Sequence, residues 1–168
     1  MPPNGRRLCI ASNVTKMKSY KSRQRKKYKH VMVFGVFDGL HPGHLFFLRQ
    51  AKKYGRELVV VVARDSAVFK LKKKWPHYEE RRRLQEIKRI KAIKRAVLGD
   101  RTQGVYRVVR KFKPDVICFG YDQRDFEKDL KRRMRQNFFH PFRVVRLKSH
   151  HPKIFHSSRL RAKITPER

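Results

Sequence analysis

Short, nearly continuous apolar runs alternate along the chain with longer segments in which apolar residues recur at helical spacing. Residues 31–37 read VMVFGVF, and residues 57–63 read ELVVVVA. Runs of this kind are typical of strands that are buried on both faces of a parallel sheet. Five strands are predicted in this way, at residues 31–37, 57–63, 95–98, 115–120 and 142–147.

The segments between these runs predict helices. Apolar residues at positions 45, 46, 48 and 51 recur at helical spacing, Pro42 occupies a first-turn position and Gly55 follows the last turn. Further helices are predicted at residues 79–92, 105–112, 126–135 and 157–164. Strands separated by helices imply right-handed β-α-β units. We therefore expect a Rossmann-like α/β fold with a doubly wound parallel sheet, whose ligands bind at the carboxyl ends of the strands.

The first 30 residues differ from the rest of the chain. Residues 1–30 carry ten Lys or Arg, no acidic residue and no regular apolar pattern. We expect them to form a basic, flexible extension. A total length of 168 residues favours one domain of ordinary size, which we place at residues 31–168.

Positive charge extends through the whole chain. Lys and Arg number 46 against 13 Asp and Glu, so the formal net charge is +33. Such a surface attracts nucleotides, RNA and anionic lipids. The same excess also arises when a whole proteome is adapted to a salt-rich cytoplasm. Composition alone leaves both explanations open.

Other features exclude several classes of protein. The longest apolar run, residues 58–63, is far shorter than the roughly 20 residues of a membrane span. The N-terminus lacks the apolar core of a signal peptide. The two cysteines, Cys9 and Cys118, have no CxxC spacing, which excludes a disulfide scaffold and a zinc ribbon. We expect a cytoplasmic protein.

The segment between the first strand and the first helix, GVFDGLHPGH (residues 35–44), is the most informative part of the sequence. Gly35 at the strand end would let a phosphate approach the backbone. His41 and His44 lie three residues apart at a helix N-terminus, where free N–H groups favour anions. Two imidazoles there can donate hydrogen bonds to phosphate oxygens as charge develops in a transition state. In the alternative interpretation, His41 caps the helix and His44 fills its first turn.

Two other phosphate or metal motifs are excluded. The chain contains no GxxxxGK[ST] segment, so it has no P-loop. The His-x-x-His pair lacks further ligands at the spacing that zinc requires.

Residues 35–44 resemble the GxFDxxHxGH signature of the cytidylyltransferase-like nucleotidyltransferases. Further segments resemble landmarks of that family in the same order, which extends the resemblance over residues 31 to about 164. These landmarks are residues 63–65, Lys70 and Lys72, residues 78–81, residues 114–123 and residues 155–158.

The resemblance implies a nucleotidyltransferase domain in which a substrate phosphate attacks the α-phosphorus of a nucleoside triphosphate and releases pyrophosphate. His41 and His44 would stabilise the transition state, while Lys70 or Lys72 would bind the incoming phosphate. Mg²⁺, or another divalent cation, would bind the phosphates of ATP or CTP without a protein metal cage. The implied nucleotide contacts are Gly35, Val36, Phe37, Asp38, Gly43, Asp65, Arg81, Gly120, Asp122, Ser157, Ser158 and Arg159.

Within the family, residues 61–65, 96–99, 119–123 and 155–158 are most similar to archaeal-type FAD synthases. The resemblance therefore implies FMN adenylyltransferase activity, with ATP and FMN as substrates. One alternative is CTP-dependent transfer to glycerol 3-phosphate or a similar phosphorylated alcohol. Another is a non-catalytic nucleic-acid-binding protein on the same fold, which the charge favours. By resemblance we also expect a homodimer.

Two positions depart from the family pattern. The final motif, residues 156–161, reads HSSRLR and lacks the usual threonine, so Arg159 or Arg161 would take over a triphosphate contact. Lys73 stands where a glycine is often found, which predicts a different shape for the segment that carries Lys70 and Lys72.

Overall fold

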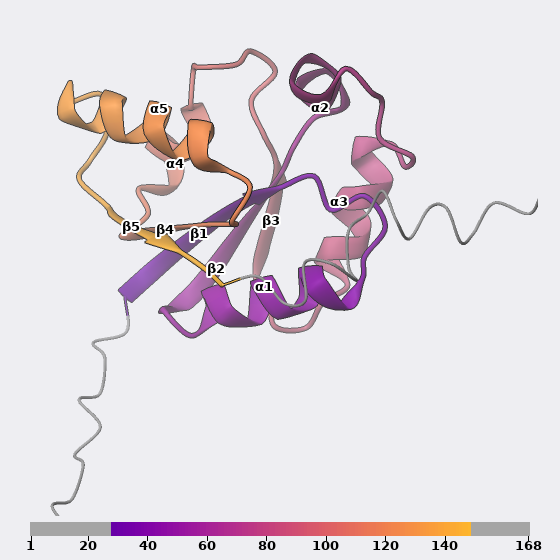
Figure 1. Ribbon diagram of the computed structural model, residues 1–168. Coiled ribbons are helices and arrows are strands. Elements are labelled where there is room, and N and C mark those ends of the chain that lie inside the picture. The colour runs from indigo at the N-terminus through magenta and orange to yellow at the C-terminus, as the bar shows by residue number, and fades with distance from the viewer. Residues whose placement is uncertain (1–27, 149–168) are drawn as a thin grey trace, which may run out of the picture.

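The computed structural model describes residues 28–148, and these form one five-stranded sheet with helices on both faces (Figure 1). All neighbouring strands are parallel, and their order across the sheet is β3-β2-β1-β4-β5. The strands are β1 (Tyr28–Gly35), β2 (Gly55–Val62), β3 (Arg95–Leu98), β4 (Val116–Phe119) and β5 (Arg143–Arg146). The helices are α1 (Pro42–Lys52), α2 (Asp65–Lys72), α3 (Glu80–Lys88), α4 (Arg107–Phe112) and α5 (Arg124–Arg135).

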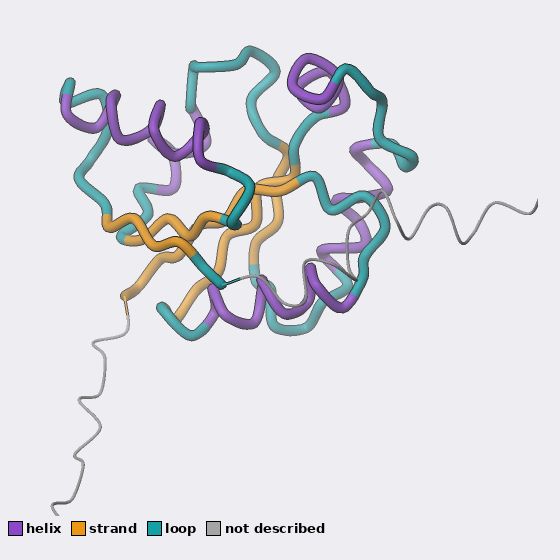
Figure 2. Tube along the Cα trace, in the orientation of Figure 1, coloured by secondary structure: helices purple, strands orange, loops and turns teal. Residues whose placement is uncertain are grey.

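Alternating side chains of the central strands supply two separate cores. In β2, Val60 belongs to a core that also contains Leu48 of α1 and Ile87 of α3. Its neighbour Val61 points to the other face and packs in a core with Leu130 of α5. Helices α1 and α3 therefore cover one face and α4 and α5 the other, as Figure 2 shows. Burial on both faces explains why the central strands are continuous apolar runs.

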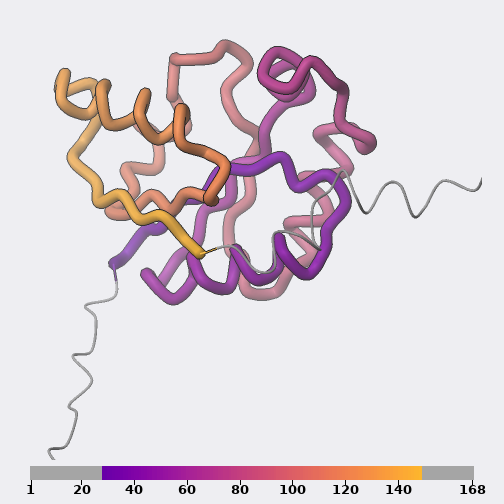
Figure 3. Tube along the Cα trace, in the orientation of Figure 1, coloured from indigo at the N-terminus to yellow at the C-terminus, as the bar shows by residue number. Residues whose placement is uncertain are grey.

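The order of the strands reverses at β1. From β1 the chain moves outward to β2 and β3, then returns past β1 to β4 and β5 (Figure 3). In an open parallel sheet, the crevice beyond the carboxyl ends of the two strands at such a reversal is the usual binding position. The segments that follow β1 and β4 should therefore hold the ligand.

The predicted fold class is confirmed, with differences in individual elements. β1 begins at Tyr28, three residues before the predicted strand, and α3 ends at Lys88 instead of residue 92. Helix α2 was not predicted because a single buried residue, Val68, anchors it in a lysine-rich segment. The helix predicted at residues 157–164 lies outside the described residues. No helix within residues 28–148 is long and apolar enough to cross a membrane.

Candidate active site

His41 and His44 lie together at the start of α1, directly beyond the carboxyl end of β1. His41 has an extended backbone and is the N-cap residue, and its Nδ1 accepts a hydrogen bond of 3.4 Å from the backbone N–H of His44. The two rings are stacked, with centroids 3.7 Å apart and planes inclined by 25°. Capping engages only Nδ1, so it is compatible with a phosphate contact through Nε2. The first turn of α1 carries no acidic residue that would neutralise its positive end.

The environment of His44 strongly favours the neutral imidazole. Burial, the charge of His41 and the charge of Lys72 together lower the pKa of His44 to about 4, although a backbone contact with Gly39 and the charge of Asp38 act in the opposite direction. The ring of Phe37 meets that of His44 edge to face, with centroids 5.4 Å apart. The Nδ1 atom is buried and has no hydrogen-bond partner among residues 28–148. A bound anion would favour protonation, so the charge of this site responds to its ligand.

This environment makes folding stability depend on pH through His44. The pKa of His44 is about 4 in the folded protein and an ordinary 6.5 in the unfolded chain. Between these values only the unfolded chain binds the proton, so stability is fully present above pH 6.5 and falls as the pH falls towards 4. We expect wild type to lose about 2 to 3 kcal/mol more than His44→Gln between pH 7 and 4.5 in urea unfolding. Parallel pH profiles for the two proteins would contradict the assignment.

Gly35 ends β1, but the space above it is filled. A Cβ at this position would lie 2.5 Å from Cζ of Phe37, whose backbone has a φ of +54° and whose ring is buried. The glycine therefore makes room for the Phe37 ring. This corrects the expected reason for a glycine here, which was close approach of a phosphate. A nucleotide contact of the backbone of Gly35 stays a prediction, as do those of Val36 and Phe37.

Asp38 connects the β1–α1 loop to the segment before α3. Its side chain accepts hydrogen bonds from the backbone N–H groups of His77, at 2.9 and 3.0 Å, and Tyr78, at 3.0 Å. Asp38 is only 8% exposed. These contacts show that Asp38 orders the loop that leads to His41, and its implied nucleotide contact stays a prediction.

The sequence analysis missed the arginine that holds this end of the sheet together. Arg83 of α3 has no exposed surface and donates to the carbonyls of Val36, Ala63 and Tyr78. It also pairs with the carboxylate of Asp65 at 2.6 Å. One guanidinium thus joins the segments that follow β1 and β2 to the start of α3. Helical spacing could have revealed it, because Arg83 lies four residues before the buried Ile87.

Asp65 and Arg81, two predicted nucleotide contacts, have different surroundings. Asp65 begins α2, where it pairs with Arg83 and accepts the backbone N–H of Glu80. The Glu80 carboxylate accepts the backbone N–H of Asp65 in return. The carboxylate of Asp65 is therefore engaged in structure. Arg81, in the first turn of α3, is exposed.

Lys70 and Lys72 lie on α2, a segment for which no helix or strand was predicted. Two residues apart on a helix, they point about 200° from each other, so only one can face a given ligand. Lys72 is the one whose charge acts on His44. Lys73 caps the helix with a φ of +53°, the left-handed conformation that favours glycine.

The segment after β4 forms the other side of the crevice. The Gln123 side chain accepts the N–H of Gly120 at 2.9 Å and donates to the Phe34 carbonyl of β1 at 2.9 Å. It therefore joins the carboxyl ends of β4 and β1. Asp122 is exposed, and its Oδ1 lies 3.0 Å from the position that a Cβ on Gly120 would occupy. The structure thus brings Gly120 and Asp122 to the same edge of the sheet as the histidines.

The remaining candidates are Gly43 and three residues near the C-terminus. Gly43 lies in the first turn of α1, between the two histidines. Ser157, Ser158 and Arg159 lie outside the described residues. Within residues 28–148, no three His, Cys, Asp or Glu side chains gather closely enough to hold a metal ion.

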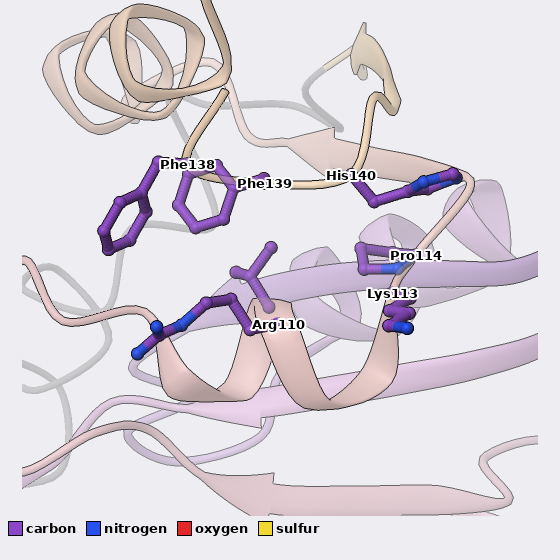
Figure 4. Close-up of a pocket in the computed structure, with 7 residues that line it drawn as sticks. Arg110, Lys113, Pro114, Phe138, Phe139 and His140 are labelled. Carbon is purple, nitrogen blue, oxygen red and sulfur yellow. The ribbon is translucent and has the colours of Figure 1, made fainter. Parts of the chain in front are cut away.

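A hollow of about 220 Å³ lies at the edge of the sheet opposite the histidine pair (Figure 4). Pro114 and His140, which line it, precede β4 and β5, whereas the histidine pair follows β1. The hollow is therefore separate from the candidate active site. Its other lining residues are Val109, Arg110, Lys113, Phe138 and Phe139.

The chain is similar to known proteins over most of its length. The chain is 48% identical over 120 residues to the FAD synthase of Aciduliprofundum boonei, an alignment that covers 71% of this chain and 78% of that protein. It is 43% identical over 134 residues to the FAD synthase of Thermoplasma acidophilum, covering 80% of this chain and 92% of that protein.

Solved structures show the same fold. The lipopolysaccharide core biosynthesis protein of Thermoplasma volcanium is 39% identical with a TM-score of 0.66, over 73% of this chain and 98% of that chain. A pantothenate synthetase of Thermus thermophilus, 17% identical with a TM-score of 0.53, shares the fold over 82% of this chain and 64% of its own. Residues 32–163 match the family model described as cytidylyltransferase-like. The chain, which carries stacked histidines at the start of α1, therefore belongs to the cytidylyltransferase-like family.

Proposed function

We propose that the protein is an FMN adenylyltransferase, which transfers AMP from ATP to the phosphate of FMN and forms FAD and pyrophosphate. The stacked His41–His44 pair at the positive end of α1 is the observation that carries the proposal. Similarity to FAD synthases over most of their length supports the choice of substrates.

In the proposed reaction, an oxygen of the FMN phosphate forms a bond to the α-phosphorus of ATP. The bond between that phosphorus and the oxygen bridging to the β-phosphate breaks, and pyrophosphate leaves with the electron pair. A phosphate monoester is largely ionised at neutral pH, so the nucleophile needs no general base. Catalysis then consists of positioning and charge stabilisation.

The chain's own residues have distinct tasks in this scheme. His41, His44 and the first-turn N–H groups of α1 stabilise the negative charge that develops on the α-phosphate. Lys72 attracts the phosphate of FMN towards the same position. A divalent cation such as Mg²⁺, bound to the phosphates of ATP, would screen the charge of their oxygens. Asp38 and Arg83 hold the geometry of the loop that leads to His41.

The proposal is tested by identifying the product that the purified protein forms, after RNA has been removed from it at high salt. With Mg²⁺, ATP and FMN we expect FAD and pyrophosphate in equal amounts, resolved by chromatography. Substitution of CTP and glycerol 3-phosphate for ATP and FMN should give no pyrophosphate. Pyrophosphate release with CTP and glycerol 3-phosphate alone would contradict the proposal and favour a cytidylyltransferase. No release with any pair would favour the nucleic-acid-binding alternative.

A further inference from the structure

Exposed aromatic and large apolar side chains gather at the ligand-binding edge of the sheet. Within residues 28–148, five such side chains are exposed, and three of them, Phe69, Leu71 and Trp75, lie in or just after α2. A fourth, Tyr121, follows β4. Only Phe138 lies at the opposite edge. An exposed apolar cluster of this kind commonly marks a binding surface.

Phe69 and Trp75 form a stacked pair that is largely open to solvent. Their ring centroids are 4.6 Å apart and the ring planes are inclined by 21°. Phe69 is 38% and Trp75 is 58% exposed. Two stacked rings exposed to this extent leave a planar aromatic face open to solvent, and we call this pair the aromatic platform. A third planar aromatic ring can stack on it in the offset geometry that aromatic groups prefer.

The platform lies near the histidine pair. Helix α2 and the loop that leads to α1 leave the same edge of the sheet, as Figure 2 shows. Phe69 and Lys72 are three residues apart on α2, so they share one face of the helix. The segment that follows Trp75 contacts the loop before α1 directly, because the backbone N–H groups of His77 and Tyr78 donate to Asp38. The aromatic pair therefore lies on the segment that packs against the loop leading to His41.

We propose that Phe69 and Trp75 bind the isoalloxazine ring of the acceptor FMN while Lys72 attracts its phosphate; this inference rests on the proposed function. Isoalloxazine is a wide, electron-poor planar ring, whereas indole is electron-rich, so the two stack favourably. The flexible ribityl chain links the ring on the platform to the phosphate beside Lys72. Glycerol 3-phosphate has no ring and could not use the platform. The exposed aromatic pair thus distinguishes a flavin acceptor from a small alcohol phosphate.

Trp75 is the only tryptophan of the chain, so its fluorescence reports on the platform alone. FMN and riboflavin should quench it in a saturable way, after correction with free tryptophan for light absorbed by the flavin. Glycerol 3-phosphate should leave it unchanged. In FAD formation, Trp75→Ala and Phe69→Ala should each raise the KM for FMN about tenfold, with the KM for ATP unchanged. Trp75→Phe should retain most of the affinity because it keeps a ring.

Phe138→Ala is the matched control, because Phe138 is 37% exposed and Phe69 is 38% exposed. It should leave the KM for FMN at the wild-type value. Equal KM values for FMN in wild type, Trp75→Ala and Phe69→Ala, with FAD still formed, would overturn the platform and leave the proposed function intact. If wild type forms no FAD, the proposed function and the platform fail together. Circular dichroism of each variant establishes that a raised KM does not reflect unfolding.

Discussion

His44→Ala should lower the kcat for FAD formation by about 10²- to 10³-fold, the usual cost of removing one donor that stabilises transition-state charge. His44 is held against His41 at the positive end of α1, and its ring is half-buried. Without the imidazole, the charge developing on the α-phosphate loses one of its fixed partners. His44→Gln keeps a side-chain N–H group and should be less impaired than His44→Ala.

The rate is measured at saturating ATP and FMN, so that the loss is assigned to the chemical step. His140→Ala is the matched control, because this exposed histidine lies beside the hollow at the opposite edge of the sheet. It should retain the wild-type kcat. A His44→Ala protein that is folded and turns over within twofold of wild type would contradict a catalytic role for His44.

The central part of the fold could be predicted because burial on both faces leaves a clear pattern. The apolar runs at residues 31–37 and 57–63 overlap β1 (Tyr28–Gly35) and β2 (Gly55–Val62), although both strands begin before the predicted residues. Helix α2 could not be predicted in the same way. Val68 is its one buried residue, and its lysines resemble those of a solvated loop. A helix that buries so little carries almost no periodic signal.

In the candidate active site too, some features could be predicted from the sequence and others could not. Residues 35–44 contain the positioning elements in one contiguous segment, so the histidine pair and its helix N-terminus could be predicted. Contacts between segments that are distant in the sequence could not be predicted. The Phe37 ring fills the space above Gly35 because the backbone of Phe37 is left-handed. The spacing of residues in the sequence does not predict this conformation. Helical spacing from Ile87 singles out Arg83 as the buried member of the run of three arginines, but it does not show which backbone carbonyls the side chain contacts.

Arg83 is the residue through which the rest of the fold most strongly holds the loop that leads to His41. Arg83 contacts the carbonyl of Val36 just after β1 and that of Ala63 just after β2. The carbonyl of Tyr78, whose N–H group binds Asp38, also accepts from Arg83. The loop that leads to His41 is thus held from both ends by a single side chain and its acceptors.

Arg83→Ala should therefore destabilise the protein by about 3 to 5 kcal/mol, enough to unfold a typical domain of this size at moderate temperature. The substitution removes the Arg83 donor from three carbonyls of half-buried residues and the ionic partner from the Asp65 carboxylate, and it opens a cavity. Arg83→Lys should recover only part of the loss, because one ammonium group cannot span acceptors that a forked guanidinium reaches.

The two preceding arginines are matched controls in the same helix turn. Arg81 is exposed, and Arg82 stacks on the Tyr78 ring at 3.9 Å and pairs with Glu86 at 3.6 Å on the surface. Arg81→Ala should change the free energy of unfolding by less than about 0.5 kcal/mol, and Arg82→Ala by at most about 1 kcal/mol. Urea unfolding measures all three. If Arg83→Ala were no less stable than Arg81→Ala, the guanidinium would not hold the ends of β1 and β2 together, and the order of the catalytic loop would have to come from Asp38 alone.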